Sequence, residues 1–104
     1  MGKIAFTMRL NRGQAVEYGR RHAQIWPELL EQLKQAGISD YTIFLDEETH
    51  VLFGVMAVAP DNMVAMLPTQ AIMRKWWAYM ADIMETHPDN EPVTKPLAQV
   101  FHLD

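Results

Sequence analysis

The chain of 104 residues contains no cysteine, no run of basic residues and no apolar segment long enough to span a membrane. The lack of cysteine excludes disulfide bonds, thiolate catalysis and sulfur-ligated metal sites. Nine basic and thirteen acidic residues give a formal charge of −4, and without a basic patch we expect no nucleic-acid partner. Around Lys3 and Arg9 the chain lacks the uninterrupted hydrophobic segment of a secretion signal, which favours a cytoplasmic protein without membrane attachment.

Hydrophobic residues make up 49% of the chain, which is enough to form a core. The length suits one compact domain, so we expect a single domain over residues 1–104. Apolar–polar alternation predicts strands, whereas apolar residues spaced three and four apart predict helices. The expected elements are a strand at 4–10, helix from about 14 to 36 with an interruption at Pro27, strands at 41–45 and 51–58, a short helix at 60–67, a longer helix at 71–84 and a last strand at 97–103.

This order of strand, helix, strand, strand, helix and strand is typical of one fold class. The short turn at 46–50 makes the second and third strands an antiparallel hairpin. Right-handed crossovers then favour a ferredoxin-like βαββαβ sandwich, an α+β fold with helices on one face of a four-stranded antiparallel sheet. Pro27 disrupts a helix interior but also suits the first turn of a new helix, so the sequence leaves a kink and a break equally open.

The third strand is apolar on both faces, although a sheet covered on one side only normally carries polar residues on its free face. Alternate residues point to opposite faces, and both sets are apolar: Val51, Phe53, Val55 and Ala57 on one, Leu52, Met56 and Val58 on the other. We therefore expect an apolar cover, most simply a second copy of the sheet in a homodimer of the α/β-barrel type. The alternative is that loops and the C-terminal segment cover this face.

A phenol and an imidazole lie one helical turn apart on the face that we expect to point inward. Tyr18 and His22 are four residues apart and so share a helix face, which continues through Ile25, Leu29 and Leu33. Such a pair is either buried structural material or the polar lining of a pocket. An imidazole with a pKa of about 6.5 donates or accepts protons at neutral pH, which makes His22 the candidate catalytic residue.

Aromatic residues supply the other candidates. Trp76 and Trp77 are adjacent in a predicted helix, so their rings point about 100° apart. Either they belong to a wide buried face, or one or both form the wall of a ligand pocket, where flat rings suit the apolar face of a sugar and the indole N–H donates a hydrogen bond. Tyr41 at the beginning of a strand is equally compatible with core packing and with a hydroxyl at a pocket mouth.

The remaining histidines do not form a metal-ligand motif. His50 is predicted in a turn, His87 in a proline-rich loop and His102 in the last strand, so we predict no metal site. The sequence also contains no glycine-rich phosphate loop and no nucleophile elbow.

Several segments resemble one known family. They are Tyr18-Gly-Arg-Arg-His22, Ile25-Trp-Pro-Glu-Leu29, 41–46, 52–54, Lys75-Trp-Trp-Ala-Tyr-Met80, 88–90 and 92–93. The segment from Arg21 to Glu28 and the paired tryptophans in 76–80 are specific, whereas the strand matches at 41–46 and 52–54 are weaker. Together they cover nearly the whole chain and are similar to the L-rhamnose mutarotases. The loop differs at His87 and Glu91, where asparagine and serine are expected.

The resemblance implies a cytoplasmic homodimer of ferredoxin-like subunits that interconverts the α and β anomers of L-rhamnose without a metal or cofactor. By position, His22 is the proton donor, and the sugar contacts are Tyr18, Tyr41, Trp76 and Trp77. Ring opening needs a proton on the ring oxygen and loss of the anomeric hydroxyl proton. The sequence leaves open whether Tyr18, a water or His22 itself removes that proton.

Two other functions are compatible with the pattern. A small cofactor-free monooxygenase on the same fold would use the aromatics and the histidine around an aromatic substrate. A non-enzymatic dimeric module would bind a sugar in the same pocket without changing any rate. The sequence does not determine which pyranoses other than rhamnose are accepted.

Overall fold

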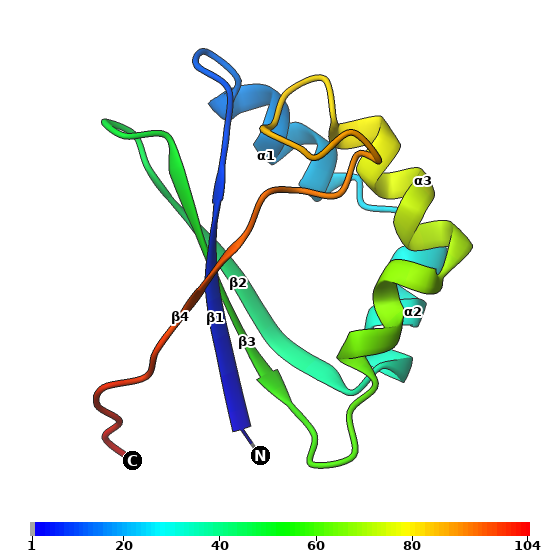
Figure 1. Ribbon diagram of the computed structural model, residues 1–104, viewed down its shortest axis with the longest axis vertical. Helices are drawn as coiled ribbons and strands as arrows, with labels where there is room; N and C mark the ends of the chain where they lie inside the picture. The colour runs from blue at the N-terminus through cyan, green and yellow to red at the C-terminus, as the bar shows by residue number, and fades with distance from the viewer. Residues whose placement is uncertain (1) are drawn as a thin grey trace.

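The computed structural model describes residues 2–104. Its elements, in chain order, are β1 (Gly2–Arg9), α1 (Ala15–Ala23), α2 (Pro27–Gln35), β2 (Ile38–Asp46), β3 (Val51–Val58), the 3₁₀ helix η1 (Val64–Thr69), α3 (Ala71–Met80) and β4 (Lys95–Leu97). The strands form one antiparallel sheet in the order β2-β3-β1-β4, and the helices lie on one of its faces (Figure 1). This is the predicted ferredoxin-like architecture.

The helical segment is broken at Pro27. Helix α1 ends at Ala23, and Trp26 has extended backbone angles of φ −65° and ψ 131° before Pro27 begins α2. Proline is tolerated at this first helical position because its missing N–H would have no partner there in any case. Gly37, with φ +90°, follows the end of α2 in the left-handed conformation common after helices. The break therefore lets α1 and α2 take separate positions over the sheet.

Helix α3 ends at Met80, four residues before the predicted end at Met84. The next residues pair with the extension of β1: Leu10 forms an isolated bridge with Met84, and the Asn11 N–H donates to the Ile83 carbonyl at 2.8 Å. Ile83 is 3% exposed, so its side chain is buried in the core although it lies beyond the end of α3. Periodicity alone did not reveal this change because a buried apolar run is compatible with either conformation.

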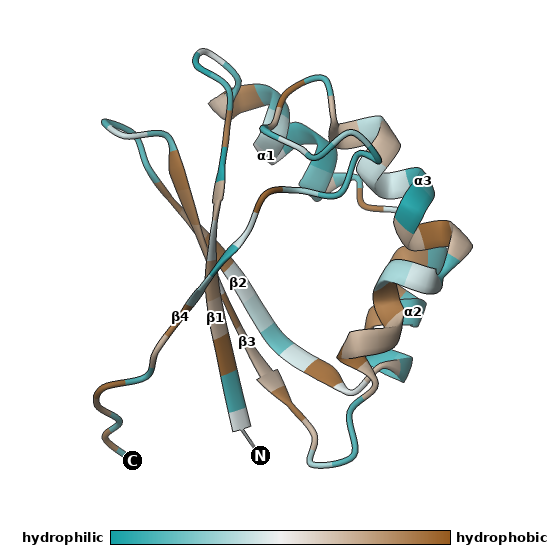
Figure 2. Cartoon of the chain, in the orientation of Figure 1, coloured by the Kyte–Doolittle hydropathy of each residue, from teal (hydrophilic) through white to brown (hydrophobic). Residues whose placement is uncertain are grey.

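The last strand was predicted wrongly at 97–103. Strand β4 consists of Lys95–Leu97 and pairs only with Ala5–Thr7 of β1. Beyond it the chain leaves the sheet, and the C-terminal tail carries hydrophobic residues without a cover (Figure 2). Apolar alternation predicted a strand there, but an edge strand forms only where a neighbouring strand accompanies it.

The other bounds differ by smaller amounts. Strand β1 begins two residues earlier than predicted and ends at Arg9, and β2 spans Ile38–Asp46, in place of 41–45. The predicted helix at 60–67 is the 3₁₀ helix at Val64–Thr69, which contains Pro68. Strand β3 has the predicted bounds.

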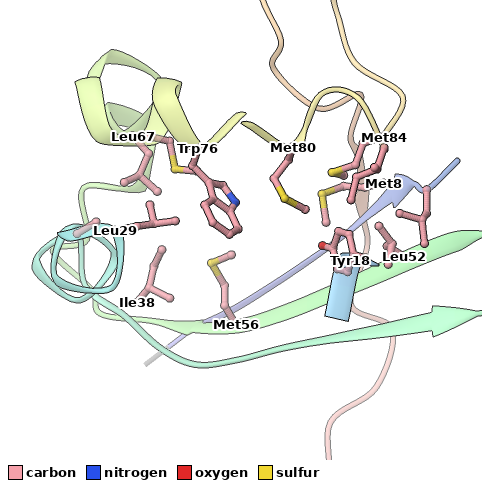
Figure 3. Close-up of a cluster of buried hydrophobic side chains, with 14 of the residues drawn as sticks. Met8, Tyr18, Leu29, Ile38, Leu52, Met56, Leu67, Trp76, Met80 and Met84 are labelled. Carbon is pink, nitrogen blue, oxygen red and sulfur yellow. The ribbon is translucent and has the colours of Figure 1, made fainter. Parts of the chain in front are cut away.

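The core lies between the inner face of the sheet and the helices. Leu29 of α2, Leu52 of β3 and Met80 of α3 are its most fully buried large side chains. Each such burial contributes roughly 1.5–3 kcal/mol. Figure 3 shows Trp76 within the same cluster, between Met56 of the sheet and the side chains of the helical layer.

The outer face of the sheet is apolar and exposed. Phe44 of β2 and Phe53 of β3 are directly opposite each other across the strands, and they are 63% and 37% exposed. The C-terminal residues 98–104 are themselves exposed and leave this face open. Within residues 2–104, no helix has the length and apolar character needed to cross a bilayer.

Candidate active site

A cavity of about 1010 Å³ lies between the inner face of the sheet and the helical layer. Its volume is at the upper end of the range of small-molecule sites. All five side chains that the sequence singled out contribute to its wall: Tyr18, His22, Tyr41, Trp76 and Trp77. A smaller hollow of about 70 Å³ is lined by the same five residues. Segments far apart in the sequence thus meet around one space.

Tyr18 and His22 are stacked side by side on α1. Their ring centroids are 4.2 Å apart, with an angle of 28° between the planes, as the spacing of one helical turn requires. His22 Nδ1 lies 3.0 Å from the Tyr18 carbonyl oxygen. A carbonyl only accepts hydrogen bonds, so Nδ1 carries the hydrogen, and in the neutral ring Nε2 holds the free lone pair. The helix itself therefore selects the tautomer.

Burial sets the protonation states at this end of the cavity. It lowers the pKa of His22 below 6.5, against the opposing effect of the bond to the Tyr18 carbonyl, so the imidazole is neutral at pH 7. Burial raises the pKa of Tyr41 to about 12 and raises that of Tyr18 further, with Tyr41 adding to the latter shift. Both phenols therefore stay protonated, and neither makes a hydrogen bond within residues 2–104.

The two tryptophans of α3 occupy different environments. Trp76 is 6% exposed and meets His22 edge to face, with centroids 5.3 Å apart at 90°. Trp77 is half-buried, and its ring lies 5.9 Å from the Arg74 guanidinium. Trp76 thus belongs to the core and to the cavity wall at once. The two interpretations of the sequence are not exclusive.

Tyr41 reaches the cavity because β2 is irregular. The pairing of β2 with β3 shifts register between Ser39 and Thr42, and Asp40 has a φ of +47°. Tyr41 lies within this bulge and meets Phe6 of β1 edge to face, with centroids 6.2 Å apart. Tyr41 is therefore inside the strand and does not begin it as predicted. No sequence signal marked the bulge.

Gly54 of β3 makes room for this contact. A Cβ atom at position 54 would lie 2.6 Å from the Phe6 ring, closer than real contacts allow. The Phe6 ring thus lies over Gly54 and contacts Tyr41. The glycine in the family-like segment 52–54 has a packing role.

Sequence reasoning missed Glu91 as a wall residue. It lies in the loop after α3 and lines the cavity with Pro92. The loop is held by a 2.8 Å bond from the His87 N–H to the Glu91 carbonyl and by an ion pair of 3.6 Å between Arg74 and Asp89. Its one signal in the sequence was the glutamate at a position where the family is expected to have serine.

The other three histidines do not line this cavity, and among residues 2–104 no three His, Cys, Asp or Glu side chains gather in a metal-binding arrangement. Comparison with known proteins identifies the family. The family model for L-rhamnose mutarotase matches residues 3–103. The chain belongs to the L-rhamnose mutarotase family.

Relatives within the L-rhamnose mutarotase family match over nearly their full length. The L-rhamnose mutarotase of Sinorhizobium fredii is 62% identical over 103 residues, which is 99% of each chain. That of Jannaschia sp. is 56% identical with the same coverage. The crystal structure of an L-rhamnose mutarotase from Formosa agariphila covers all of both chains at 47% identity, with a TM-score of 0.93. Similarity of this extent covers every element that contributes to the cavity.

Proposed function

We propose that this chain is an isomerase that interconverts the α and β anomers of L-rhamnopyranose by acid–base catalysis at His22. The observation that carries the proposal is a neutral imidazole with a free Nε2, on a cavity wall with two protonated phenols, in a chain of the L-rhamnose mutarotase family. The reaction needs proton transfer and no redox change. General acid–base catalysis contributes roughly 10²–10⁴-fold to such reactions.

His22 serves both proton transfers in this mechanism. Nε2 takes the proton of the anomeric hydroxyl while the bond between C1 and the ring oxygen breaks, and the ring oxygen receives a proton from the imidazolium. The product is the open-chain aldehyde, and rotation about its C1–C2 bond before closure gives the other anomer. Both oxygens are bonded to the same carbon, so one nitrogen reaches each in turn. Tyr18 is a poor alternative base because its phenol is held protonated.

The remaining four residues bind the sugar. The hydroxyls of Tyr18 and Tyr41 donate hydrogen bonds to sugar oxygens, since burial keeps both protonated. Trp76 and Trp77 contact the apolar face of the ring and the C6 methyl group. These contacts hold the anomeric carbon beside the imidazole, which is the orientation that proton transfer requires.

His22→Ala is the direct test. We expect loss of accelerated anomer exchange with L-rhamnose, measured by saturation-transfer NMR, with an unchanged circular dichroism spectrum. His102→Ala is the matched control, because this exposed histidine lies outside the cavity. Full activity of the His22 variant would refute the assignment. Calorimetric binding of rhamnose by the unaltered chain without faster exchange would indicate a sugar-binding module in its place.

The homodimer belongs to the same proposal. Two outer sheet faces packed together would cover Phe44 and Phe53, which a single chain leaves exposed. Phe44→Glu places a charge in that interface, and we expect it to shift sedimentation from dimer to monomer, whereas Val16→Glu, on exposed α1 surface, should not. A monomeric unaltered chain would contradict this. We further propose, from the family resemblance, that the protein acts in the cytoplasm.

A further inference from the structure

Arg21 is a buried charged side chain that the proposed chemistry does not use. It directly precedes His22, and 9% of its surface is exposed. Its guanidinium forms a two-pronged pair with Asp82, at 2.8 Å and 3.2 Å. Nη1 also donates to the Tyr79 carbonyl at 2.8 Å, and Nε donates to Glu17 at 2.7 Å. One side chain thus links α1 to the end of α3.

The contact with α3 is made where that helix needs a partner. Helix α3 ends at Met80, so the Tyr79 carbonyl belongs to the last turn, whose carbonyls have no partner within the helix. A cation at a helix C-terminus also interacts favourably with the helix dipole. Asp82 follows in the turn that leaves the helix, and the pair with Arg21 lowers its pKa. Arg21 therefore fixes both the last turn of α3 and the chain beyond it.

A series of aromatic contacts leads from Arg21 back to His22. The guanidinium lies 4.5 Å from the centroid of the Tyr79 ring, and Tyr79 stacks on Trp26 at 5.5 Å. Trp26 meets Trp76 edge to face at 5.1 Å, and Trp76 meets His22 in the same way at 5.3 Å. Neighbouring helix residues point about 100° apart. Arg21 and His22 therefore contact α3 at two places, Arg21 at its last turn and His22 at Trp76.

We propose that Arg21 is a positioning residue that holds the His22 imidazole against Trp76 in the catalytic geometry. The inference rests on the proposed role of His22 in proton transfer. Without the guanidinium, α1 and the last turn of α3 lose their common anchor, and the imidazole loses its fixed distance from the sugar. A displacement of about 1 Å at a reacting group reduces rate by up to roughly 100-fold. Lysine cannot reproduce the two-pronged contact with Asp82, because its ammonium group is a compact charge without the planar pair of N–H donors that the guanidinium has.

Arg21→Met and Arg21→Lys test the anchor, with Arg20→Met as the matched control. Arg20 precedes Arg21 and shares Glu17, at 2.6 Å, but it is exposed. Its guanidinium donates to Glu17 and Gln24 and interacts with the Tyr79 side chain, whereas Arg21 holds the Tyr79 carbonyl and Asp82. We expect Arg21→Met to reduce kcat roughly 10- to 100-fold with KM for L-rhamnose changed less than about 3-fold. Arg21→Lys should recover part of kcat, and Arg20→Met should match the unaltered protein.

Asp82→Asn keeps the Arg21 side chain and weakens its ion pair with residue 82. It therefore tests the positioning role of Arg21 even if Arg21→Met fails to fold. Asp82 is 66% exposed, and the fold should therefore tolerate this change. Removing a negative charge would by itself lower the His22 pKa, whereas a loosened, better hydrated imidazole has a higher pKa. We expect NMR titration of the His22 ring protons to show the rise, together with a reduced kcat.

Unchanged kcat in both Asp82→Asn and Arg21→Lys would overturn the proposal, as would a His22 pKa that falls in Asp82→Asn. An equal loss in Arg20→Met would show a general effect of charge on α1 and would also overturn it. The titration does not depend on activity. If the unaltered chain does not accelerate anomer exchange, the proposed function fails, while the titration still reports on the anchor.

Discussion

The two faces of the sheet are built from the same kind of residue but have opposite surroundings. On β3, Leu52 points inward and is 1% exposed, whereas its neighbour Phe53 points outward and is 37% exposed. The inner face is covered by the helices of the same chain, which leave a cavity beside the core. The outer face has no cover within residues 2–104. The hydrophobic character of a sheet face thus shows that the face must be covered. It does not show whether the cover comes from the same chain or from another one.

The largest effect is expected where α3 covers the inner face. Trp76 is buried in the core as well as lining the cavity, so Trp76→Ala should destabilise the fold by about 3–5 kcal/mol and also raise KM. Trp77 is half-buried, and Trp77→Ala should mainly raise KM. Urea unfolding and NMR exchange kinetics on both variants check this. Equal losses of stability would show that the two rings do not differ in their structural role.

The next comparison uses adjacent residues on opposite faces. Leu52→Ala should lower the free energy of unfolding by about 2–5 kcal/mol, because it leaves a cavity in the core. Phe53→Ala should have a smaller effect on the fold of one chain and should instead weaken association between chains. Thermal unfolding and sedimentation, measured on the same samples, separate the two effects. A Phe53 variant that dimerises normally would remove the outer face from the interface.

The smallest expected effect is a change of activity with pH. Burial lowers the His22 pKa, so the neutral, active imidazole persists below pH 6.5 and is lost only as pH falls through the lowered value. We expect kcat/KM to stay constant from neutral pH to below 6.5 and to decline only at still lower pH. Phe44 and Phe53 have no titratable group, so association of two chains through the outer face should not change with pH in the way that kcat/KM does. A decline of kcat/KM that begins above pH 7 would contradict the assignment of this loss of activity to protonation of His22.

Much of the fold was predictable because its signals are local. The turn at 46–50 fixed the hairpin, and β3 has the predicted bounds at Val51–Val58. The end of α3 was not predictable in this way, since residues after Met80 pair with Leu10, more than seventy positions away. The last strand failed for a related reason: a strand requires a neighbour, and β1 accompanies the final segment only along Lys95–Leu97.

The candidate site shows the same division. Tyr18 and His22 could be paired from the sequence because one helical turn brings them together. Arg21 could not be singled out from the sequence, because its ion pair with Asp82 joins residues 61 positions apart. Glu91 was noticed only as a departure from the family pattern, because nothing in a loop sequence shows which side chains face a cavity.

By itself the sequence determined the order of the elements, the apolar character of both sheet faces and the shared face of Tyr18 and His22. These features follow from the spacing of residues along the chain, because the regular periods of helix and strand fix the face to which each side chain points. Only the tertiary structure decided that Tyr41 enters the cavity through a bulge, and that Arg21 joins α1 to α3. Such features depend on contacts between distant segments, and their energies exist only after the chain has folded.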